Sequence, residues 1–331
     1  MARTILYNAS ETGTAAYLLP LWERLHAKND QDWRVLSSGF LDTWMEQHHL
    51  TSSSFIRPEP HDVESLTASL QGFQPELIIT SAANRPLDEV VRAYGKKHNI
   101  PRVAIIDTWY GYRKRLLDKN GVLHQPDAIL VIDNTAISEA RSEGLEEQRL
   151  HAIGHPAWEN TLSHNIPPAN PAHIAFINQP IERHYGNSLG YTEHTAFQML
   201  VATLLSHPDL AEKVIYCPHP DDAGENIPTG MPIEVITDGR DALFAAGTVI
   251  GMFSSLLSDA FLSGRKTISW QPGAPDAGLC SLARHDYIAF ANTAEGLCKA
   301  LRNPPHDDAK LRTTLIGSTD RLQNFVEAFA A

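Results

Sequence analysis

The chain has 331 residues, of which 43% are hydrophobic and 20% are charged, as in a globular protein with a full core. This length is too great for one typical domain and suits two. Lys and Arg number 27 against 39 Asp and Glu, for a formal net charge of −12. A general nucleic-acid binder needs a basic face, so we expect no nucleic-acid partner.

The cysteines and the hydropathy of the sequence indicate the cellular compartment of the protein and whether it crosses a membrane. Three cysteines without metal-ligand spacing favour a reduced, cytoplasmic protein. The amino terminus turns polar at once and is read as a strand, and no apolar run reaches the roughly 18–20 residues that span a bilayer. Peripheral association with a membrane and the oligomeric state stay open. The 16 histidines lack the short paired spacings of zinc sites, so we expect no metal and no cofactor.

Apolar strands alternate with amphipathic helices along the first half of the chain. Strands are predicted at residues 4–8, 33–37, 76–81, 102–107, 128–133 and 150–153, and helices at 15–28, 41–48 and 87–98. This alternation predicts a mostly parallel sheet covered on both faces.

Polar loops follow these strands, where open α/β sheets bind ligands. The first loop holds Glu11, Thr12 and Gly13 and lacks the three-glycine dinucleotide fingerprint, so an NAD site is not expected. Asp107 ends a strand and enters a loop with three aromatics and a cationic cluster that includes Arg113. Aromatic and cationic groups together can hold an anionic or sugar-like acceptor. Plain helix caps are the alternative for Thr12 and Asp107.

A proline-rich stretch separates two halves. It predicts a linker at residues 158–171 between a first, acceptor-side domain (1–157) and a second, nucleotide-sugar-binding domain (172–309). A final helix at 310–331 has an apolar face available to pack back on the first domain. Second-half strands are predicted at 174–178, 213–217, 233–237, 248–251, 267–270 and 288–291. The predicted fold class is α/β, with two Rossmann-like doubly wound domains facing across a cleft.

The stretch from residue 247 to 270 predicts a strand, a helix and a strand. Ser254 and Ser255 stand where strand gives way to helix, a position whose hydroxyls, backbone N–H groups and helix dipole favour an anion. At 100° per residue, the serines and Asp259 fall on an arc opposite the apolar one, so we expect this polar arc to face the cleft. The serines would hold phosphate and Asp259 would accept from sugar hydroxyls. Ordinary helix capping is the alternative.

Two other loops of the second half carry polar candidates. Asn178, Gln179, Glu182 and Arg183 follow the first strand of this half, which places them at the cleft by position alone. His219 lies between two prolines after the next strand, where an imidazole can contact phosphate directly. A structural turn histidine is the alternative reading.

These motifs resemble a known family. His219-Pro220, Ser254-Ser255 and Asp259-Ala260 resemble the carboxyl-terminal half of GT-B glycosyltransferases, closest to bacterial sialyltransferase-like and CDP-glycerol or Kdo capsule transferases. The stretch AILVIDNTAISEARSEG…HAIGHPAWEN resembles the end of the first domain in these enzymes and in the related UDP-GlcNAc 2-epimerase group. The resemblance implies that the His-Pro motif and the serine pair grip the phosphate of a CMP- or CDP-linked donor, with the acid near its ribose.

One element of that family pattern is absent. The sialyltransferase-like families carry an acidic pair before glycine in the first domain as catalytic base, and this sequence lacks it. Glu11, Asp107 and Glu143 are alternative base candidates in no order. The predicted function is a metal-independent glycosyltransferase of surface polysaccharide biosynthesis. It would move a sugar from a CMP-, CDP- or UDP-linked donor to a hydroxyl of a glycan, lipid-linked or capsule acceptor. Alternatives are a non-hydrolysing UDP-GlcNAc 2-epimerase and a catalytically silent nucleotide-sugar-binding protein.

Overall fold

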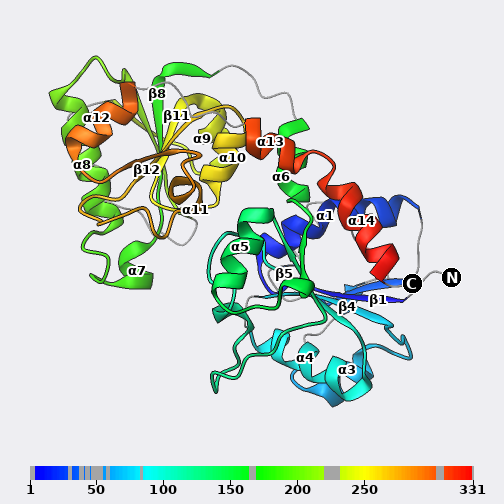
Figure 1. The fold of residues 1–331 in the computed structure, drawn as a ribbon. Coiled ribbons are helices and arrows are strands. Elements are labelled where there is room, and N and C mark those ends of the chain that lie inside the picture. Colours follow the sequence, from blue (N-terminus) through cyan, green and yellow to red (C-terminus); the bar gives the residue numbers. More distant parts are fainter. Residues whose placement is uncertain are drawn as a thin grey trace. The chain divides into compact units, whose positions relative to one another are not determined.

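The computed structural model describes residues 4–28, 32–36, 41, 45, 55–56, 60–82, 85–163, 169–219, 232–302 and 309–329. The chain divides into two compact units (Figure 1). The first unit comprises Met1–Asn160 and Leu311–Ala331, and the second comprises Thr161–Lys310. Each contains one parallel sheet with helices on its faces, so the predicted pair of Rossmann-like, doubly wound α/β domains is confirmed.

The sheet of the first unit has the strand order β3-β2-β1-β4-β5-β6-β7. Its strands are β1 (Ile5–Asn8), β2 (Trp33–Leu36), β3 (Phe55–Ile56), β4 (Leu77–Ser81), β5 (Arg102–Ile105), β6 (Ala128–Val131) and β7 (Leu150–Ala152). The helices include α1 (Thr12–Ala27), α3 (Val63–Ser69), α4 (Pro86–His98), α5 (Asn134–Ser142), α6 (Pro156–Ser163), α13 (Ala309–Leu315) and α14 (Ser318–Phe329). The short strand β3 and helix α3 are not predicted from the sequence, and the predicted helix 41–48 lies mostly outside the described residues.

The sheet of the second unit repeats this order as β10-β9-β8-β11-β12-β13. Its strands are β8 (Asn170–Ile177), β9 (Lys213–Cys217), β10 (Ile233–Val235), β11 (Ala246–Gly251), β12 (Lys266–Trp270) and β13 (Ala289–Ala291). Its helices include α7 (Ile181–Tyr185), α8 (Glu193–Ser206), α9 (Gly239–Ala245), α10 (Leu256–Leu262), α11 (Ser281–Arg284) and α12 (Ala294–Arg302). Helix α6 and strand β8 reach into both ends of the stretch predicted to be a linker.

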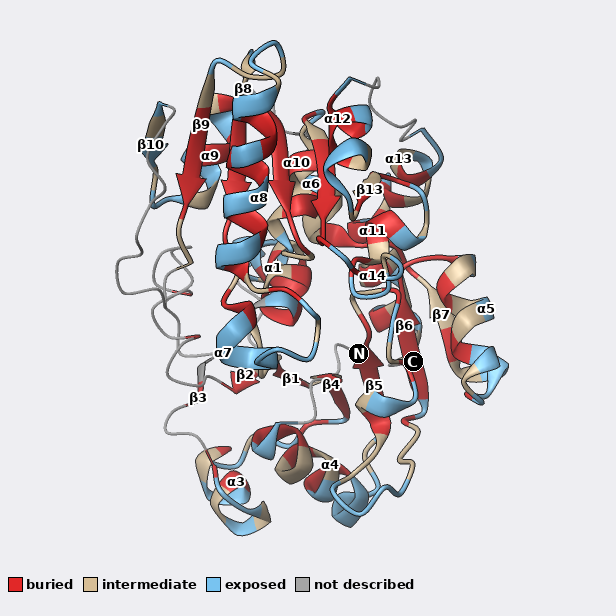
Figure 2. Ribbon diagram, turned by 90° about the vertical axis from the view of Figure 1, so that its left-hand side faces the viewer, coloured by how far each residue is buried: buried red, intermediate tan, exposed pale blue. Residues whose placement is uncertain are grey.

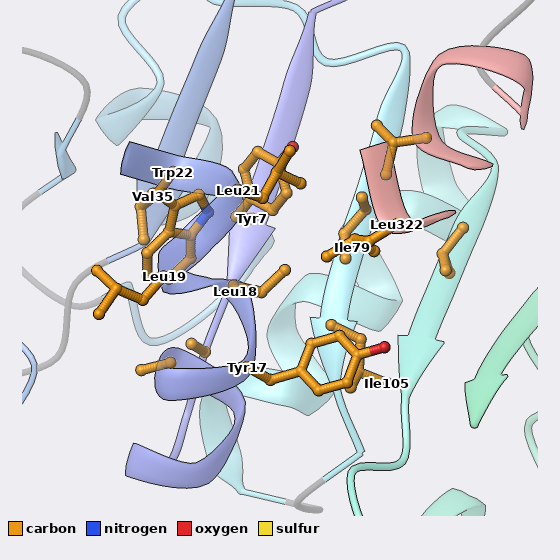
Figure 3. Packing of buried hydrophobic residues seen from close by; sticks show 14 of the residues in the cluster. Tyr7, Tyr17, Leu18, Leu19, Leu21, Trp22, Val35, Ile79, Ile105 and Leu322 are labelled. Atoms are coloured by element: carbon orange, nitrogen blue, oxygen red, sulfur yellow. The ribbon is translucent and has the colours of Figure 1, made fainter. Parts of the chain in front are cut away.

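The strands of the first sheet alternate between two apolar cores. Ile79 of β4 packs toward α1 and α14, whereas its neighbour Ile78 packs toward α3 and α4. Figure 3 shows the first of these cores, with Trp22 of α1 and Leu322 of α14 among its members. Because both faces are covered, the central strands are buried along their length (Figure 2).

The predicted single helix at residues 310–331 is wrong, because the chain breaks between α13 and α14. Gly317 has a φ of 80°, a left-handed conformation that a glycine adopts without strain and that ends a helix. Beyond the break, Leu322 and Val326 of α14 belong to the core of the first unit. The Glu159 carboxylate of α6 accepts from the backbone N–H of Thr319 at 2.8 Å, which ties the first turn of α14 to the same unit.

Candidate functional site

Both sheets reverse their strand order at one point. In the first unit the reversal lies between β1 and β4, and in the second between β8 and β11. Loops on either side of such a point diverge to opposite faces of the sheet, so the carboxyl ends of these strands are where open α/β sheets bind ligands. The polar candidates of both halves follow these strands or their neighbours.

In the second unit, a hydrogen bond spans the reversal point. The Gln179 side-chain carbonyl, after β8, accepts from the backbone N–H of Phe253, after β11, at 2.7 Å. Asn178 is buried, and its backbone N–H donates to the carbonyl of Cys217 at 2.9 Å. These bonds hold the ends of β8, β9 and β11 at a common edge.

The two predicted phosphate serines begin α10 in different ways. The Ser254 hydroxyl accepts from the backbone N–H of Leu256 at 3.3 Å, so it caps the helix. Ser255 precedes the helix directly, makes no side-chain cap, and is exposed. Ser255 therefore has a hydroxyl open to a ligand, whereas Ser254 has its hydroxyl hydrogen still to donate.

The polar arc of α10 varies in exposure along the helix. Ser258 is buried, and the Asp259 side chain is partly buried. Burial raises the pKa of Asp259 to about 6, opposed by the positive charge of Arg240. Helix α9, which the sequence does not predict, begins beside α10: a Cβ on Gly239 would lie 2.7 Å from Leu256 Cδ1. Helix α9 therefore packs beside the apolar residue Leu256 at the start of α10.

The remaining candidates of the second unit are distributed around this edge. His219 follows β9, and only β8 lies between β9 and β11. The ends of β9 and β11 are therefore two strand spacings apart, roughly 10 Å in total. Glu182 and Arg183 are exposed on α7, and Glu182 pairs with His194 at 3.6 Å. The structure therefore brings Asn178 and Gln179 to the start of α10 and leaves Glu182 and Arg183 on the surface.

Sequence reasoning missed Gln271 at the end of β12. Its amide donates to the Ser269 hydroxyl at 2.9 Å and its carbonyl accepts from the Tyr191 hydroxyl at 3.2 Å. The side chain is buried, and burial raises the pKa of Tyr191, which stays a neutral donor. A polar residue directly after an apolar strand was the signal available in the sequence. The hydrogen bonds of Gln271 to Ser269, Met252 and Tyr191 hold the end of β12 from inside the unit.

In the first unit, a buried carboxylate fills the reversal point. Asp88 of α4 accepts from the side chains of Asn8, Ser10 and Ser81 and from the backbone N–H of Arg85. The Asn8 and Ser81 bonds measure 2.7 and 2.8 Å. This network joins the ends of β1 and β4 to the first turn of α4, and it satisfies the carboxylate with protein donors.

Two of the three base candidates come together beside this network. Glu11 precedes α1, and a Cβ on Gly13 would lie 2.7 Å from Asp107 Oδ2, so the missing side chain lets the carboxyl reach the first turn of α1. Arg115 Nη1 lies 3.5 Å from Glu11 Oε1. Burial raises the pKa of both acids, and the charge of Asp107 raises that of Glu11 further, whereas Arg115 lowers both. Thr12 begins α1, and its side chain lies outside what the structure describes.

The third candidate lies elsewhere. Glu143 follows α5, which begins at the carboxyl end of β6 and runs back toward the opposite edge of the sheet. Its carboxylate accepts from the backbone N–H of Arg113 at 2.7 Å. Arg113 is exposed, and Arg115, two residues on, is the cation that faces the acids. Glu11, Asp107 and Arg115 therefore lie together at this edge of the first unit, and Glu143 instead bonds the backbone of Arg113.

No three His, Cys, Asp or Glu side chains gather in a way that could hold a metal ion within the described ranges. Among these residues, too, no helix is both long and apolar enough to cross a bilayer.

No protein-family model matches the chain, and no curated protein matches it in sequence. Solved structures do resemble it. The UDP-GlcNAc 2-epimerase of Methanocaldococcus jannaschii has a TM-score of 0.67 at 12% identity, over 98% of this chain and 99% of its own, and has also been solved with UDP-GlcNAc and UDP.

Two further structures extend this likeness. The glycosyltransferase of kitacinnamycin has a TM-score of 0.67 at 14% identity over 99% of both chains. An Anabaena protein in complex with UDP and glucose has a TM-score of 0.56 at 12% identity over the full length of both chains. The shared feature is a GT-B-like fold of two Rossmann-like domains.

Proposed function

We propose that this protein binds a nucleotide sugar at the carboxyl edge of the second unit's sheet and transfers the sugar to a hydroxyl acceptor. The observation that carries the proposal is the Gln179–Phe253 hydrogen bond across the reversal point, which holds the start of α10 beside the end of β8. Ser254, Ser255 and His219 would donate to the phosphates, and Asp259 would accept from the ribose. The neighbours solved with UDP or UDP-GlcNAc support a nucleotide-sugar ligand.

The edge suits a departing phosphate. In sugar transfer, the bond from C1 to the phosphate oxygen breaks and negative charge grows on that oxygen. Hydroxyl, imidazole and backbone N–H donors fixed near it lower the barrier, because they need no reorganisation as charge develops. Gln179 adds a neutral amide beside these donors, and its carbonyl fixes the backbone of Phe253.

The first unit would supply the base. A bond forms between the acceptor oxygen and C1, and the acceptor proton goes to a carboxylate. Glu11 and Asp107 are suited to this role because burial and their mutual proximity raise the pKa of Glu11, and burial raises that of Asp107. A carboxylate of raised pKa is the stronger base. Arg115 would keep one of the pair ionised. The acceptor is proposed to be a glycan, lipid-linked or capsule hydroxyl.

A non-hydrolysing 2-epimerase is the second candidate, favoured by the likeness to the M. jannaschii enzyme across nearly the whole chain. It would use the same nucleotide edge, and its product would be an epimer with the nucleotide still attached. A catalytically silent nucleotide-sugar-binding protein is the third candidate, favoured by the missing acidic pair before glycine.

Two measurements test this proposal. A thermal-shift panel of CMP, CDP, UDP and GDP identifies the nucleotide, because a ligand that binds only the native state raises its stability. The sugar conjugate of the stabilising nucleotide is then followed by NMR with and without hydroxyl acceptors. Free nucleotide plus glycoside indicates transfer, an intact nucleotide with an epimerised sugar indicates epimerisation, and unchanged conjugate over every acceptor indicates a silent binder. Absence of stabilisation by all four nucleotides would contradict the proposal.

A further inference from the structure

Two aromatic side chains meet at the carboxyl edge of the second unit. Tyr185 is the last residue of α7, and Phe253 directly precedes the two serines at the start of α10. Their ring centroids lie 5.8 Å apart with the planes at 88°, which is an edge-to-face contact. This contact covers at most one face of the Tyr185 ring, and the residue is 40% exposed. An exposed aromatic ring therefore lies beside the residues proposed to hold phosphate.

The backbone that carries this ring is fixed before and after it. The buried Glu193 carboxylate, at the start of α8, accepts from the backbone N–H of Glu182 at 2.8 Å and so fixes the start of α7. After α7, the Ser188 hydroxyl donates to the backbone carbonyl of Tyr185 at 2.7 Å. The ring is thus presented by an ordered turn, and a ligand that packs on it has less ordering to offset.

A carboxylate lies next to the ring on α7. Glu182 and Tyr185 are three residues apart, so their side chains are neighbours on the surface of the helix. The Glu182 carboxylate lies 3.6 Å from His194, and both residues are exposed. A carboxylate has two oxygens and several lone pairs, so it can also accept from the hydroxyls of a ligand. An apolar ring beside such an acceptor suits a pyranose, which has an apolar C–H face and a rim of hydroxyls.

The proposed nucleotide site indicates which part of the ligand reaches this ring. Asp259, the proposed ribose contact, lies within α10 and feels the positive charge of Arg240 on α9. Phe253 lies before α10, where the Gln179 bond holds the chain beside the end of β8. A phosphate at the two serines would lie between Asp259 and Phe253. Because phosphate joins ribose to sugar in a nucleotide sugar, the group on the Phe253 side is the sugar.

We propose that Tyr185 contacts the sugar of the nucleotide-sugar donor, with a pyranose packed on the exposed face of its ring and a sugar hydroxyl donating to Glu182. This inference rests on the proposed nucleotide edge and adds to it the position of the sugar. Tyr185 is a specificity-determining residue in this arrangement, because its ring favours a donor that carries a pyranose over the nucleotide alone. The nucleobase lies beyond the ribose and does not reach the ring.

Isothermal titration of the full chain with matched pairs of ligands tests the proposal. The pairs are UDP with UDP-N-acetylglucosamine, GDP with GDP-mannose, and CMP with CMP-N-acetylneuraminate. For the pair that binds the parent, Tyr185→Ala should weaken the nucleotide sugar about tenfold and the nucleotide less than about twofold, since only the sugar loses an apolar contact. Tyr185→Phe keeps the ring and should bind both ligands like the parent. The ratio of the two dissociation constants isolates the contribution of the sugar.

Phe244→Ala is the matched control. Phe244 is also 40% exposed and belongs to the same unit, but it lies two residues before β11, whose amino end is at the opposite edge of the sheet from Phe253. Both of its affinities should equal those of the parent. An unchanged ratio in Tyr185→Ala, with equal losses for the two ligands or with none, would overturn the proposal and leave the nucleotide edge intact. No binding of any pair to the parent would contradict the nucleotide edge itself, and this inference with it.

Discussion

The two units have the same strand order, yet their carboxyl edges differ in chemistry. At the reversal point of the first unit, the buried Asp88 carboxylate gathers protein donors, with Glu11 and Asp107 beside it. At the corresponding point of the second unit, the contact is made by the neutral amide of Gln179, next to the exposed hydroxyl of Ser255. Topology brings loops together in both units, and the residue types decide what each edge can bind.

This difference divides the proposed reaction between the units. Phosphates are repelled by carboxylates and held by neutral or cationic donors, so the second edge suits a nucleotide. Proton transfer needs a carboxylate whose pKa is raised, as burial provides for Glu11 and Asp107 in the first unit. A change at the first edge should therefore alter catalysis without altering nucleotide binding, whereas a change at the second edge should weaken nucleotide binding.

The largest effect is expected from Asp107→Asn. Removing the proposed base should lower the turnover rate by roughly 10²–10⁴-fold while nucleotide affinity stays within about twofold. Steady-state kinetics and titration calorimetry measure the two quantities. Glu143→Gln is the matched control, since Glu143 holds a backbone N–H away from the acid pair, and should keep full activity. Full turnover in both Asp107→Asn and Glu11→Gln would remove the pair from the mechanism.

Asp88→Ala tests whether the first edge is built for stability. It leaves the donors of Asn8, Ser10, Ser81 and the Arg85 backbone without their acceptor, and should reduce the free energy of unfolding by about 2–4 kcal/mol. Urea denaturation measures the change. Glu89→Ala, at the next position of α4, should cost less than about 1 kcal/mol. An equal loss in the two variants would contradict the role of the network.

His219→Ala examines the second edge. Loss of a hydrogen bond to phosphate should cost roughly 1.5–3 kcal/mol of binding, or about a tenfold or greater rise in the nucleotide Kd. Ser255→Ala should have a smaller effect because backbone N–H groups remain. His26→Ala, an exposed residue of α1 in the first unit, is the control and should bind like the parent. Unchanged affinity in His219→Ala would leave that histidine as a turn residue.

Asp259→Asn should produce the smallest change, in the pH dependence of stability. The pKa of Asp259 is raised from an ordinary value near 3.8 to about 6, so the folded state holds the proton more tightly than the unfolded state. Its ionisation therefore costs stability as pH rises from about 4 to 6. Above pH 6 the variant should be more stable than the parent by about 1–2 kcal/mol, since partial exposure reduces the effect.

Urea denaturation at pH 4, 5, 6 and 7 follows the difference between this variant and the parent. The exposed Asp241→Asn in α9 is the control, and its difference from the parent should stay flat over the same range. A flat difference for Asp259→Asn as well would show that the carboxyl is solvated like a surface acid.

Much of the fold could be predicted because the strands are apolar runs separated by amphipathic helices. The break at Gly317 was missed because apolar positions on both sides continue a helical period, although a glycine followed by serine can end one helix and begin another. Helix α9 (Gly239–Ala245) was missed for a different reason. Helix α9 packs beside α10, and contacts between elements leave no trace in the periodicity of either one.

In the candidate site, too, some features could be predicted from the sequence pattern and others could not. The proximity of Glu11 and Asp107 could be predicted because both follow strands, whose carboxyl ends meet at one edge. Asp88 was missed because an acid in the first turn of a helix resembles an ordinary solvent-exposed residue favoured by the helix dipole. Arg115 rather than Arg113 pairs with Glu11, and the sequence could not indicate this because their loop has no periodicity that tells which of two nearby cations faces inward.

Hydrogen–deuterium exchange with and without the nucleotide that gives the largest thermal shift tests the central claim most directly. The account predicts slower exchange in residues 178–185 and 251–259 of the second unit, where the loop after β8 and the start of α10 would bind phosphate and ribose. Residues 8–14, at the corresponding edge of the first unit, should exchange at the same rate in both samples. Protection confined to residues 8–14, with none at 178–185 or 251–259, would contradict the division between the two edges.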